Sequence, residues 1–476
     1  MFTVLAVESK KAADKAASRL EAGSRCKIYP RSVSGRFRSI RWAINAALLG
    51  VFFLLPWLKI GGRQALLFDI PGRKFYVFNT IFWPQEVYYL AILLIFLVVA
   101  LFAFTAVAGR LWCGYACPQT VFTDIFMAIE RLIEGDRAER MRLDSGAASA
   151  GKFLGKAAKH GVWLAFSFAT AFAFVAYFIP PAELLGRIVT LDLTGANVFW
   201  LGLFTFTTYG DCGFLRELMC LVPCPYGRFQ SALFDTDTLI IGYDPGRGEP
   251  RGKIRAGDKK TGDCVDCTLC VQVCPTGIDI RDGLQYECIA CAQCIDACNS
   301  VMRKVGTPEG LIRYGSLKSI TGGATRVLRP RVIVYAVTIT VLFATLAYKL
   351  SARVPLDVEV LRDRASLYTV SADGSVSNMY TIKAMNMDNR DHSYMIRAAG
   401  IPDAVVAVGK NPVTVKSGEV YQTSLALIVK DSQMDRRVSR FDFVIEDVDD
   451  AKITAKRQST FLVPETKVRA KAAPVK

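Results

Sequence analysis

Eight cysteines between residues 264 and 298 constrain this chain more than any other feature. They form two runs with the spacing C-x2-C-x2-C-x3-C, and each cysteine of the second run follows its counterpart by 24 residues. Cysteines at every third position of a tight loop can present three thiolates to one 4Fe–4S cube. In two-cluster ferredoxins the fourth cysteine of each run serves the other cube. The spacing therefore predicts a segment that holds two 4Fe–4S clusters.

This crossing rule assigns four thiolates to each predicted cluster. The first cluster is expected on Cys264, Cys267, Cys270 and Cys298. The second cluster is expected on Cys288, Cys291, Cys294 and Cys274. Zinc and disulfides are the alternatives. Zinc sites do not require a doubled run of this spacing, and disulfides need an oxidising compartment.

Apolar segments indicate a membrane protein. Hydrophobic residues make up 52% of the 476 residues, and five apolar runs are long enough to cross a bilayer. We expect these transmembrane helices at residues 42–58, 87–108, 161–179, about 197–215 and 332–350. An odd number of spans would place the two termini on opposite sides of the membrane.

The net charge of +16 comes largely from basic residues that flank these apolar runs. This distribution is typical of cytoplasmic membrane flanks and does not indicate nucleic-acid binding. The segment 109–159 has eight basic residues, whereas 180–196 has one. We therefore expect a multi-pass protein of a bacterial inner membrane, with a cytoplasmic N-terminus, a cytoplasmic cluster segment and a periplasmic C-terminal region.

A second set of cysteines lies near the ends of two predicted spans. Cys113 and Cys117 precede Pro118, and Cys220 and Cys224 precede Pro225, so a C-x3-C-P motif occurs twice at an offset of 107 residues. We interpret 42–126 and 161–233 as parallel two-span repeats that bring the four thiols together. Such thiols could be packing residues, a redox-active dithiol, or ligands of Cu(I) or of a further iron–sulfur cluster.

Asp211 is the one carboxylate expected inside a span. Charged residues at membrane depth are costly and usually face a partner or a cavity, and we expect Arg110 to be its charge partner. Its role could be architectural or part of a metal or proton path. The chain has no phosphate-cradling loop and no G-x-G-x-x-G after a strand, so its electrons must come from another protein or from a quinol.

After the fifth predicted span the sequence changes to short alternating runs separated by turn residues. We expect strands near 354–361, 379–387, 421–429 and 440–446, in an antiparallel sandwich of about 110 residues without a disulfide. Five side chains of this region could bind copper, although methionines at strand spacing are more often core residues. These are Met379, Met385, Met387, Met395 and His392.

Together these features predict an order of domains. They are a cytoplasmic extension (1–40), a four-helix membrane region (41–235), a ferredoxin domain with its linker (236–330), a fifth transmembrane helix (331–351), an immunoglobulin-like domain (352–465) and a disordered tail (466–476).

Several motifs in this order resemble the CcoG family, also called RdxA or FixG. They are Trp112–Thr120 (WCGYACPQT), Cys224–Gln230 (CPYGRFQ), Arg247–Gly252 (RGEPRG) and the cluster run from Gly262 to Asn299. The resemblance implies a membrane dicluster ferredoxin, accessory to the assembly of cbb(3)-type cytochrome c oxidase, that reduces Cu(II) to Cu(I). It also implies that Cys113, Cys117, Cys220 and Cys224 are the copper or redox site, and that oxidase subunits or copper chaperones are partners.

Two further functions remain compatible with the sequence. One is a non-catalytic assembly factor, in which the clusters sense redox state and the C-terminal domain docks oxidase subunits. The other is a quinol-linked electron relay. The predicted enzyme, a cupric reductase, differs from both because it must convert Cu(II) to Cu(I).

Overall fold

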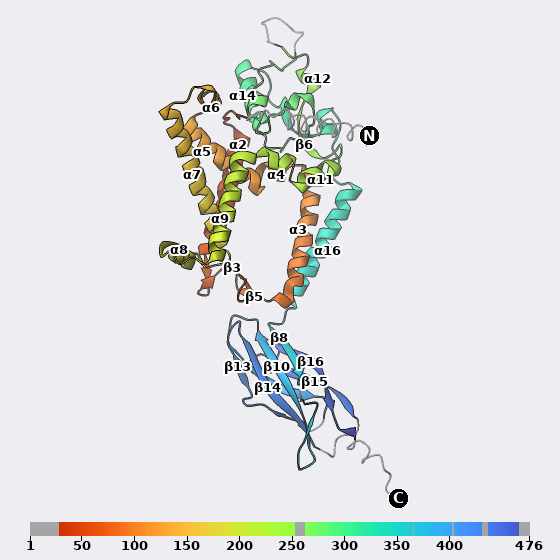
Figure 1. Ribbon diagram of the computed structural model, residues 1–476. Coiled ribbons are helices and arrows are strands. Elements are labelled where there is room, and N and C mark those ends of the chain that lie inside the picture. The colour runs from red at the N-terminus through yellow and green to blue at the C-terminus, as the bar shows by residue number, and fades with distance from the viewer. Residues whose placement is uncertain (1–27, 253–261, 365, 402–403, 431–436, 466–476) are drawn as a thin grey trace. The chain divides into compact units, whose positions relative to one another are not determined.

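The computed structural model describes residues 28–252, 262–364, 366–401, 404–430 and 437–465 (Figure 1). The predicted extension before residue 28 and the predicted tail lie outside this part of the chain. The chain divides into two compact units. Unit 1 comprises residues 1–57 and 91–344, and unit 2 comprises residues 58–90 and 345–476. The segment after the first span thus belongs with the C-terminal domain, which the sequence did not indicate.

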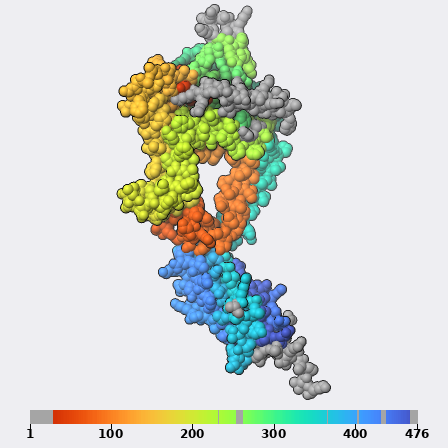
Figure 2. Space-filling view, viewed as in Figure 1, coloured from red at the N-terminus to blue at the C-terminus, as the bar shows by residue number. Residues whose placement is uncertain are grey.

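Four helices of the described chain are long and apolar enough to cross a membrane. They are α2 (Arg36–Leu54, extended by η1, Leu55–Trp57), α3 (Val87–Ala108), α7 (Ala150–Val175) and α16 (Pro330–Ser351). Much of their apolar surface is exposed, for example at Leu94 on α3 and Val334 on α16, and the space-filling view shows the side chains of α3 at the surface (Figure 2). Such surface is stable in lipid and would favour aggregation in water.

The fourth predicted span is interrupted. Helix α9 (Gly195–Gly210) passes into a π-helical turn, η3 (Asp211–Leu215), and Arg216 then has a φ of 43° before α10 (Glu217–Leu221) begins. A π-turn inserts an extra residue into the helical ladder and is common at functional sites. The regular helix has 16 residues, so the total of five spans stays a prediction.

The two C-x3-C-P motifs adopt the same local structure. Cys113 lies in the short helix α4 (Leu111–Tyr115), and Cys117 is the N-cap of α5 (Pro118–Glu134). Cys220 lies in α10, and Cys224 is the N-cap of α11 (Pro225–Leu233). Each proline occupies the first helical turn, where its missing N–H costs no hydrogen bond. The prolines therefore redirect the chain by starting a new helix.

The remaining helices of unit 1 are short or connect these elements. They are α6 (Arg137–Ser145), α8 (Pro181–Val189), α12 (Pro245–Gly248), α13 (Leu269–Gln272), η4 (Ile280–Asp282), α14 (Gln293–Val305) and α15 (Leu317–Ile320). The cysteine-rich segment lies between the antiparallel strands β6 (Leu239–Tyr243) and β7 (Ile312–Ser316). Helix α14 and these strands enclose a small apolar core that includes Ile241, Ile295 and Leu311. The pairing of β6 with β7 brings the two ends of the cysteine-rich segment together, so that the segment forms one domain.

Unit 2 contains the predicted sandwich of antiparallel sheets. One sheet has the order β12-β14-β10-β8, with β9 paired to β10, and the other has the order β13-β11-β15-β16. The strands are β8 (Leu356–Arg362), β9 (Thr369–Val370), β10 (Val376–Asn386), β11 (His392–Ala399), β12 (Val405–Ala407), β13 (Val413–Val415), β14 (Val420–Val429), β15 (Val438–Asp447) and β16 (Thr454–Leu462). Alternate residues of β10, such as Tyr380 and Ile382, are buried between the sheets, as period-2 alternation predicts.

Residues 58–90 add short strands to unit 2. They are β1 (Lys59–Ile60), β2 (Arg63–Gln64), β3 (Leu66–Asp69), β4 (Lys74–Val77) and β5 (Thr80–Phe82), followed by η2 (Pro84–Glu86). Ile81 and Trp83 from this segment form a buried cluster with Met385 and Met387. The Arg353 guanidinium donates to the Glu86 carboxylate, 2.5 Å from Oε1 and 2.8 Å from Oε2.

These contacts bear on the candidate copper ligands of the sandwich. Met385 and Met387 are core residues, and Met379 and Met395 lie in different sheets. Both ring nitrogens of His392 are engaged, Nδ1 2.7 Å from Asp447 and Nε2 3.0 Å from Asp388. The alternative of core packing therefore describes Met385 and Met387 better than copper ligation does.

Candidate iron–sulfur and thiol sites

The eight cysteines of the doubled run line two cavities. The first, called cavity 1, is lined by Cys264, Cys267, Cys270 and Cys298 together with apolar residues such as Met302 and Leu311. The second, called cavity 2, is lined by Cys274, Cys288, Cys291 and Cys294, and also by Cys270 and several isoleucines. Each cavity thus gathers the four thiols that the crossing rule assigns to one cluster.

The loops around the cavities owe their shape to four left-handed residues. Asp266 and Thr268 have φ values of 51° and 56°, and Ala290 and Ala292, 24 positions later, have φ values of 56° and 59°. Left-handed backbone is costly for residues other than glycine. In a turn it directs successive N–H groups into a concave, anion-binding nest. The repeated strain therefore indicates two cradles built for negatively charged groups.

The donor set of both cavities fits iron–sulfur clusters. All eight cysteines are free, and soft thiolates in an apolar pocket suit iron–sulfur centres. Burial raises the pKa of Cys270 and Cys288 to about 12 and that of Cys298 to about 11. Alone, these thiols would stay protonated at neutral pH. A bound metal deprotonates a coordinating thiol, so the cavities become thiolate sites only with metal present.

The four thiols of the C-x3-C-P motifs also lie near one another. The pKa of Cys113 is raised to about 11, mainly by burial and to a smaller extent by the charges of Cys117 and Cys224. Burial, and then the charges of the three other thiols, raise the pKa of Cys220 to about 12. The Gln230 amide donates to Cys113 Sγ over 3.2 Å. The two motifs therefore converge, as the predicted pairing requires.

This thiol set differs from the two cavities in how its cysteines are held, because each pair lies at the junction of two helices. In the described residues, the eight cysteines of the doubled run included, no group of three or more His, Cys, Asp or Glu side chains is arranged to hold a single metal ion. The four membrane-proximal thiols are thus neighbours whose side chains must move to bind one ion together. Cys212, the remaining cysteine of this region, is buried beside Phe126 and Trp163.

The two sites are in direct contact through the first C-x3-C-P motif. A Cβ added at Gly114 would lie 2.7 Å from the carbonyl oxygens of both Ile289 and Ala290, which stand within the second cysteine run. Tyr314 Oη donates to the Ala290 carbonyl over 2.7 Å and also contacts Tyr115 Oη at 3.3 Å. The loop that lines cavity 2 therefore packs against the helix that carries Cys113.

The prediction that Arg110 is the charge partner of Asp211 is wrong. Asp211 accepts a hydrogen bond from the Gln119 amide at 3.0 Å. The Arg110 guanidinium instead donates to the carbonyl oxygens of Tyr286 and Gly227. The physical reason is local, because Arg110 is the N-cap of α4, where its guanidinium reaches backbone carbonyl oxygens of Tyr286 and Gly227.

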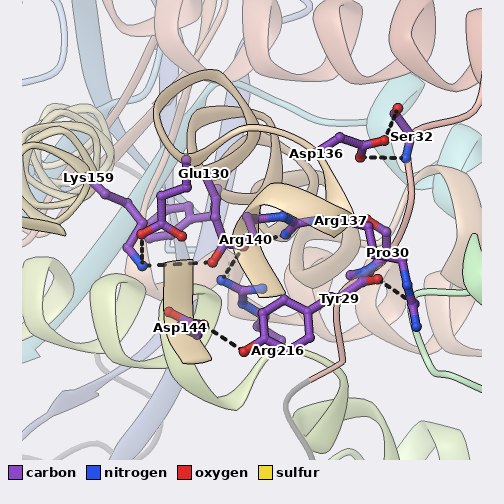
Figure 3. A network of polar contacts seen from close by, with 12 residues as sticks. Tyr29, Pro30, Ser32, Glu130, Asp136, Arg137, Arg140, Asp144, Lys159 and Arg216 are labelled. Atoms are coloured by element: carbon purple, nitrogen blue, oxygen red, sulfur yellow. Dashed lines mark hydrogen bonds and ion pairs between the residues drawn. The ribbon is translucent and has the colours of Figure 1, made fainter. Parts of the chain in front are cut away.

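A buried network of charges, which sequence reasoning missed, connects the two motifs (Figure 3). Glu130 on α5 is fully buried and contacts Arg140 and Arg216, each at 3.1 Å, and Lys159 at 3.8 Å. Arg216 directly precedes α10, which carries Cys220. A signal was present, since Glu130 and Glu134 lie four residues apart and therefore on one face of the helix α5.

Comparison with known proteins supports these assignments at the level of domains. Residues 215–317 match a family model described as a 4Fe-4S dicluster domain, and residues 90–134 match one described as a 4Fe-4S binding domain. Residues 346–464 match the IG-like fold at the C-terminus of FixG. Together with the four apolar helices, these matches define a membrane iron–sulfur redox protein with an immunoglobulin-like C-terminal domain.

Three curated relatives extend the likeness along the chain. The nitrogen fixation protein FixG of Rhizobium meliloti is 41% identical over 426 residues, covering 81% of each chain. The proteins RdxA and RdxB of Cereibacter sphaeroides are 43% and 39% identical and cover 79% and 82% of this chain and 83% and 85% of their own. The chain belongs to the FixG/RdxA family. The crystal structure of a FixG-related protein from Vibrio parahaemolyticus covers 23% of this chain and 95% of its own, at 24% identity and a TM-score of 0.21.

Proposed function

We propose that this chain is a cupric reductase of the inner membrane, which accepts single electrons on its cytoplasmic side and delivers them to copper at the membrane-proximal thiols. Cavity 1 would hold one 4Fe–4S cluster on Cys264, Cys267, Cys270 and Cys298. Cavity 2 would hold the other on Cys288, Cys291, Cys294 and Cys274. When bound, such clusters take up and release one electron at a time.

Exposure gives the electron path a direction. Cys267, on cavity 1, is exposed to solvent together with its neighbours Asp266 and Thr268. Cys291, on cavity 2, is buried, and Ile289 and Ala290 beside it pack on Gly114. A reduced one-electron carrier can therefore approach at cavity 1, and cavity 2 is the side from which the membrane thiols are reached.

One observation carries the proposal: the contact of Gly114 with the backbone of Ile289 and Ala290. It brings a thiol pair of the membrane region to a loop of the cluster domain. Reduction of each Cu(II) to Cu(I) consumes one electron, and the reduced carrier loses one electron. Cu(I) suits soft thiolate ligands, whereas Cu(II) prefers tetragonal nitrogen and oxygen donors. Thiols at Cys113, Cys117, Cys220 and Cys224 would therefore favour the reduced ion.

The cellular role follows from the family likeness. We infer that the Cu(I) serves the assembly of a cbb(3)-type cytochrome c oxidase, with oxidase subunits or their copper chaperones as partners. The basic flanks favour a cytoplasmic N-terminus and a periplasmic immunoglobulin-like domain.

A stopped-flow experiment tests the proposed activity. The dithionite-reduced full-length protein is freed of excess dithionite and mixed with Cu(II) in the presence of a Cu(I) chelator. We expect reoxidation of the clusters together with chelated Cu(I), one ion per electron. A Cys113→Ala, Cys117→Ala double variant should retain reducible clusters and form less Cu(I). Chelated Cu(I) no greater than that of a cluster-free sample would refute the activity.

A third cluster is the alternative occupant of the thiol set. The family model of a 4Fe-4S binding domain covers Cys113 and Cys117. Iron analysis of anaerobically purified protein distinguishes the two, because two cubes contain about eight irons and three contain about twelve. About twelve irons per chain would show that these cysteines hold iron and not copper.

A further inference from the structure

Arg110 is a buried cation between the two sites. It follows the end of α3 and is only 6% exposed. Its Nη2 donates to the Gly227 carbonyl over 2.8 Å, and its Nη1 donates to the Tyr286 carbonyl. The guanidinium carbon lies 4.6 Å from the centre of the Tyr286 ring. These contacts fix the guanidinium between the second C-x3-C-P motif and the loop that leads into cavity 2.

Among the buried arginines that the structure describes, Arg110 differs in lacking a carboxylate partner. Within the described residues five arginines are buried, and four of them pair with a carboxylate. Arg38 and Arg41 pair with Asp124, and Arg140 and Arg216 pair with Glu130. Arg110 has no ion pair in this part of the chain, and its Nε has no hydrogen-bond partner there. A buried charge without a counter-charge is strongly unfavourable.

The groups around Arg110 that could carry negative charge are cysteines and the Tyr226 hydroxyl. Its charge acts on Cys113 and Cys220 of the membrane-proximal set and on Cys288 of cavity 2. The contacts of Arg110 agree with this placement, because its two carbonyl acceptors belong to Gly227, three residues after Cys224, and to Tyr286, two residues before Cys288. A metal centre ligated by several thiolates is an anion. The missing counter-charge is therefore present once metal is bound.

We propose that Arg110 is the shared counter-cation of the thiolate centres on its two sides. It compensates the negative charge at cavity 2 and at Cys113 and Cys220, and it makes the cavity 2 centre easier to reduce. The inference rests on the ligand sets proposed above for cavity 2 and for the membrane-proximal thiols. Arg110 is a positioning residue, since it acts through the cysteines.

The direction of the effect follows from Coulomb's law. Reduction adds negative charge to a centre that is already anionic, and a fixed cation nearby stabilises the added charge, more strongly in a water-poor site. Arginine suits this task because it stays protonated at all relevant pH values. It also lowers the repulsion between two anionic centres, so that both can be loaded at once.

An EPR-monitored redox titration of the full-length protein tests the inference. In Arg110→Gln the cavity 2 cluster should become harder to reduce by at least tenfold in its redox equilibrium, a fall of 59 mV or more for a one-electron couple. The cavity 1 cluster should move much less. Arg110→Lys keeps the charge and should retain most of the parent potential.

A reciprocal variant assigns the signals. Arg281 lines cavity 1 and pairs with Asp266 and Asp279. Its replacement in Arg281→Gln should lower the potential of the cavity 1 cluster and leave that of cavity 2 nearly unchanged. Equal shifts of both signals in Arg110→Gln would overturn the inference, as would an unchanged cavity 2 potential.

Iron content tests the inference in variants that lose a cluster and therefore cannot be titrated. Loss of half the iron in Arg110→Gln but not in Arg110→Lys would support the counter-cation, because charge alone separates the two variants. Loss of iron in both variants would overturn the inference, because it would show that the shape of the arginine side chain, and not its charge, retains the cluster. Copper is absent from this titration, so a failed copper assay would leave the result intact.

Discussion

The two cysteine constellations of unit 1 follow the same rule in sequence and differ in structure. The doubled run repeats at 24 residues and forms two walled cavities. The C-x3-C-P motifs repeat at 107 residues and bring four thiols near each other at helix ends. In the first case strained loops fix the thiols, whereas in the second each pair lies at the junction of two helices. The comparison indicates that the same residue type is held by loop backbone in the doubled run and by helix ends in the motifs.

The largest effect is expected from removing one cluster ligand. Cys294→Ala should abolish the cavity 2 cluster, so that iron falls by about half, because three thiolates no longer close the cube. Cys113→Ala should leave the iron content unchanged and reduce Cu(I) formation. Cys212→Ala is the control, since Cys212 is buried away from both constellations. If Cys113→Ala loses as much iron as Cys294→Ala, the two sets of cysteines do not differ in the way that we propose.

The next effect concerns the buried charge that joins the two motifs. Glu130→Gln removes the carboxylate shared by Arg140, Arg216 and Lys159, and should lower the stability of unit 1 by about 3–5 kcal/mol because buried cations lose their partner. Thermal unfolding followed by tryptophan fluorescence measures this, with Trp163 close to Lys159 and Arg216.

Glu183→Gln is the matched control for this change. Glu183 pairs with Arg187 at 2.7 Å on exposed α8, where both side chains reach solvent. An exposed pair contributes roughly 0–1 kcal/mol, so this variant should unfold at nearly the parent temperature. Equal destabilisation by both variants would show that the burial of Glu130 has no special weight.

A smaller effect is expected where the two constellations touch. Gly114→Ala places a methyl group against the carbonyl oxygens of Ile289 and Ala290, which are backbone atoms and cannot rotate away. Overpacking of this kind costs about 1–3 kcal/mol. We expect unchanged iron and slower reoxidation of the clusters by Cu(II) in stopped flow. Gly202→Ala is the control because nothing lies within 4 Å of the added atom, and an equally slow Gly202→Ala variant would contradict the role of this contact.

Sequence patterns predicted the features that depend on local spacing. The cysteine grouping and the strands of the sandwich follow from short-range spacing, whereas the family was indicated by its resemblance in short motifs. The structure has strands at all four expected places. The features that were missed depend on contacts between distant residues. Trp83 meets Met385 across about 300 positions, and Arg110 turns toward Tyr286 and away from Asp211. No local pattern encodes such pairs.

The left-handed residues of the cavity loops are a second example of this limit. Glycine would have marked these turns in the sequence, but the chain has Asp266, Thr268, Ala290 and Ala292 there. Their strain is maintained by the loop around them. The prediction with the smallest expected effect concerns this strain, and it is the one most specific to the doubled run.

Ala292→Gly should relieve this strain. Ala292 is fully buried with a φ of 59°, a conformation that costs an L-residue about 1–2 kcal/mol and costs glycine almost nothing. The cavity 2 loop should therefore hold its shape better, and release of iron to a chelator should slow by up to about tenfold, the equivalent of 1.4 kcal/mol. Ala297→Gly, at a buried position within α14, is the control and should speed release because glycine weakens a helix. Faster release in Ala292→Gly would show that the side chain at this position stabilises the loop more than its backbone strain destabilises it.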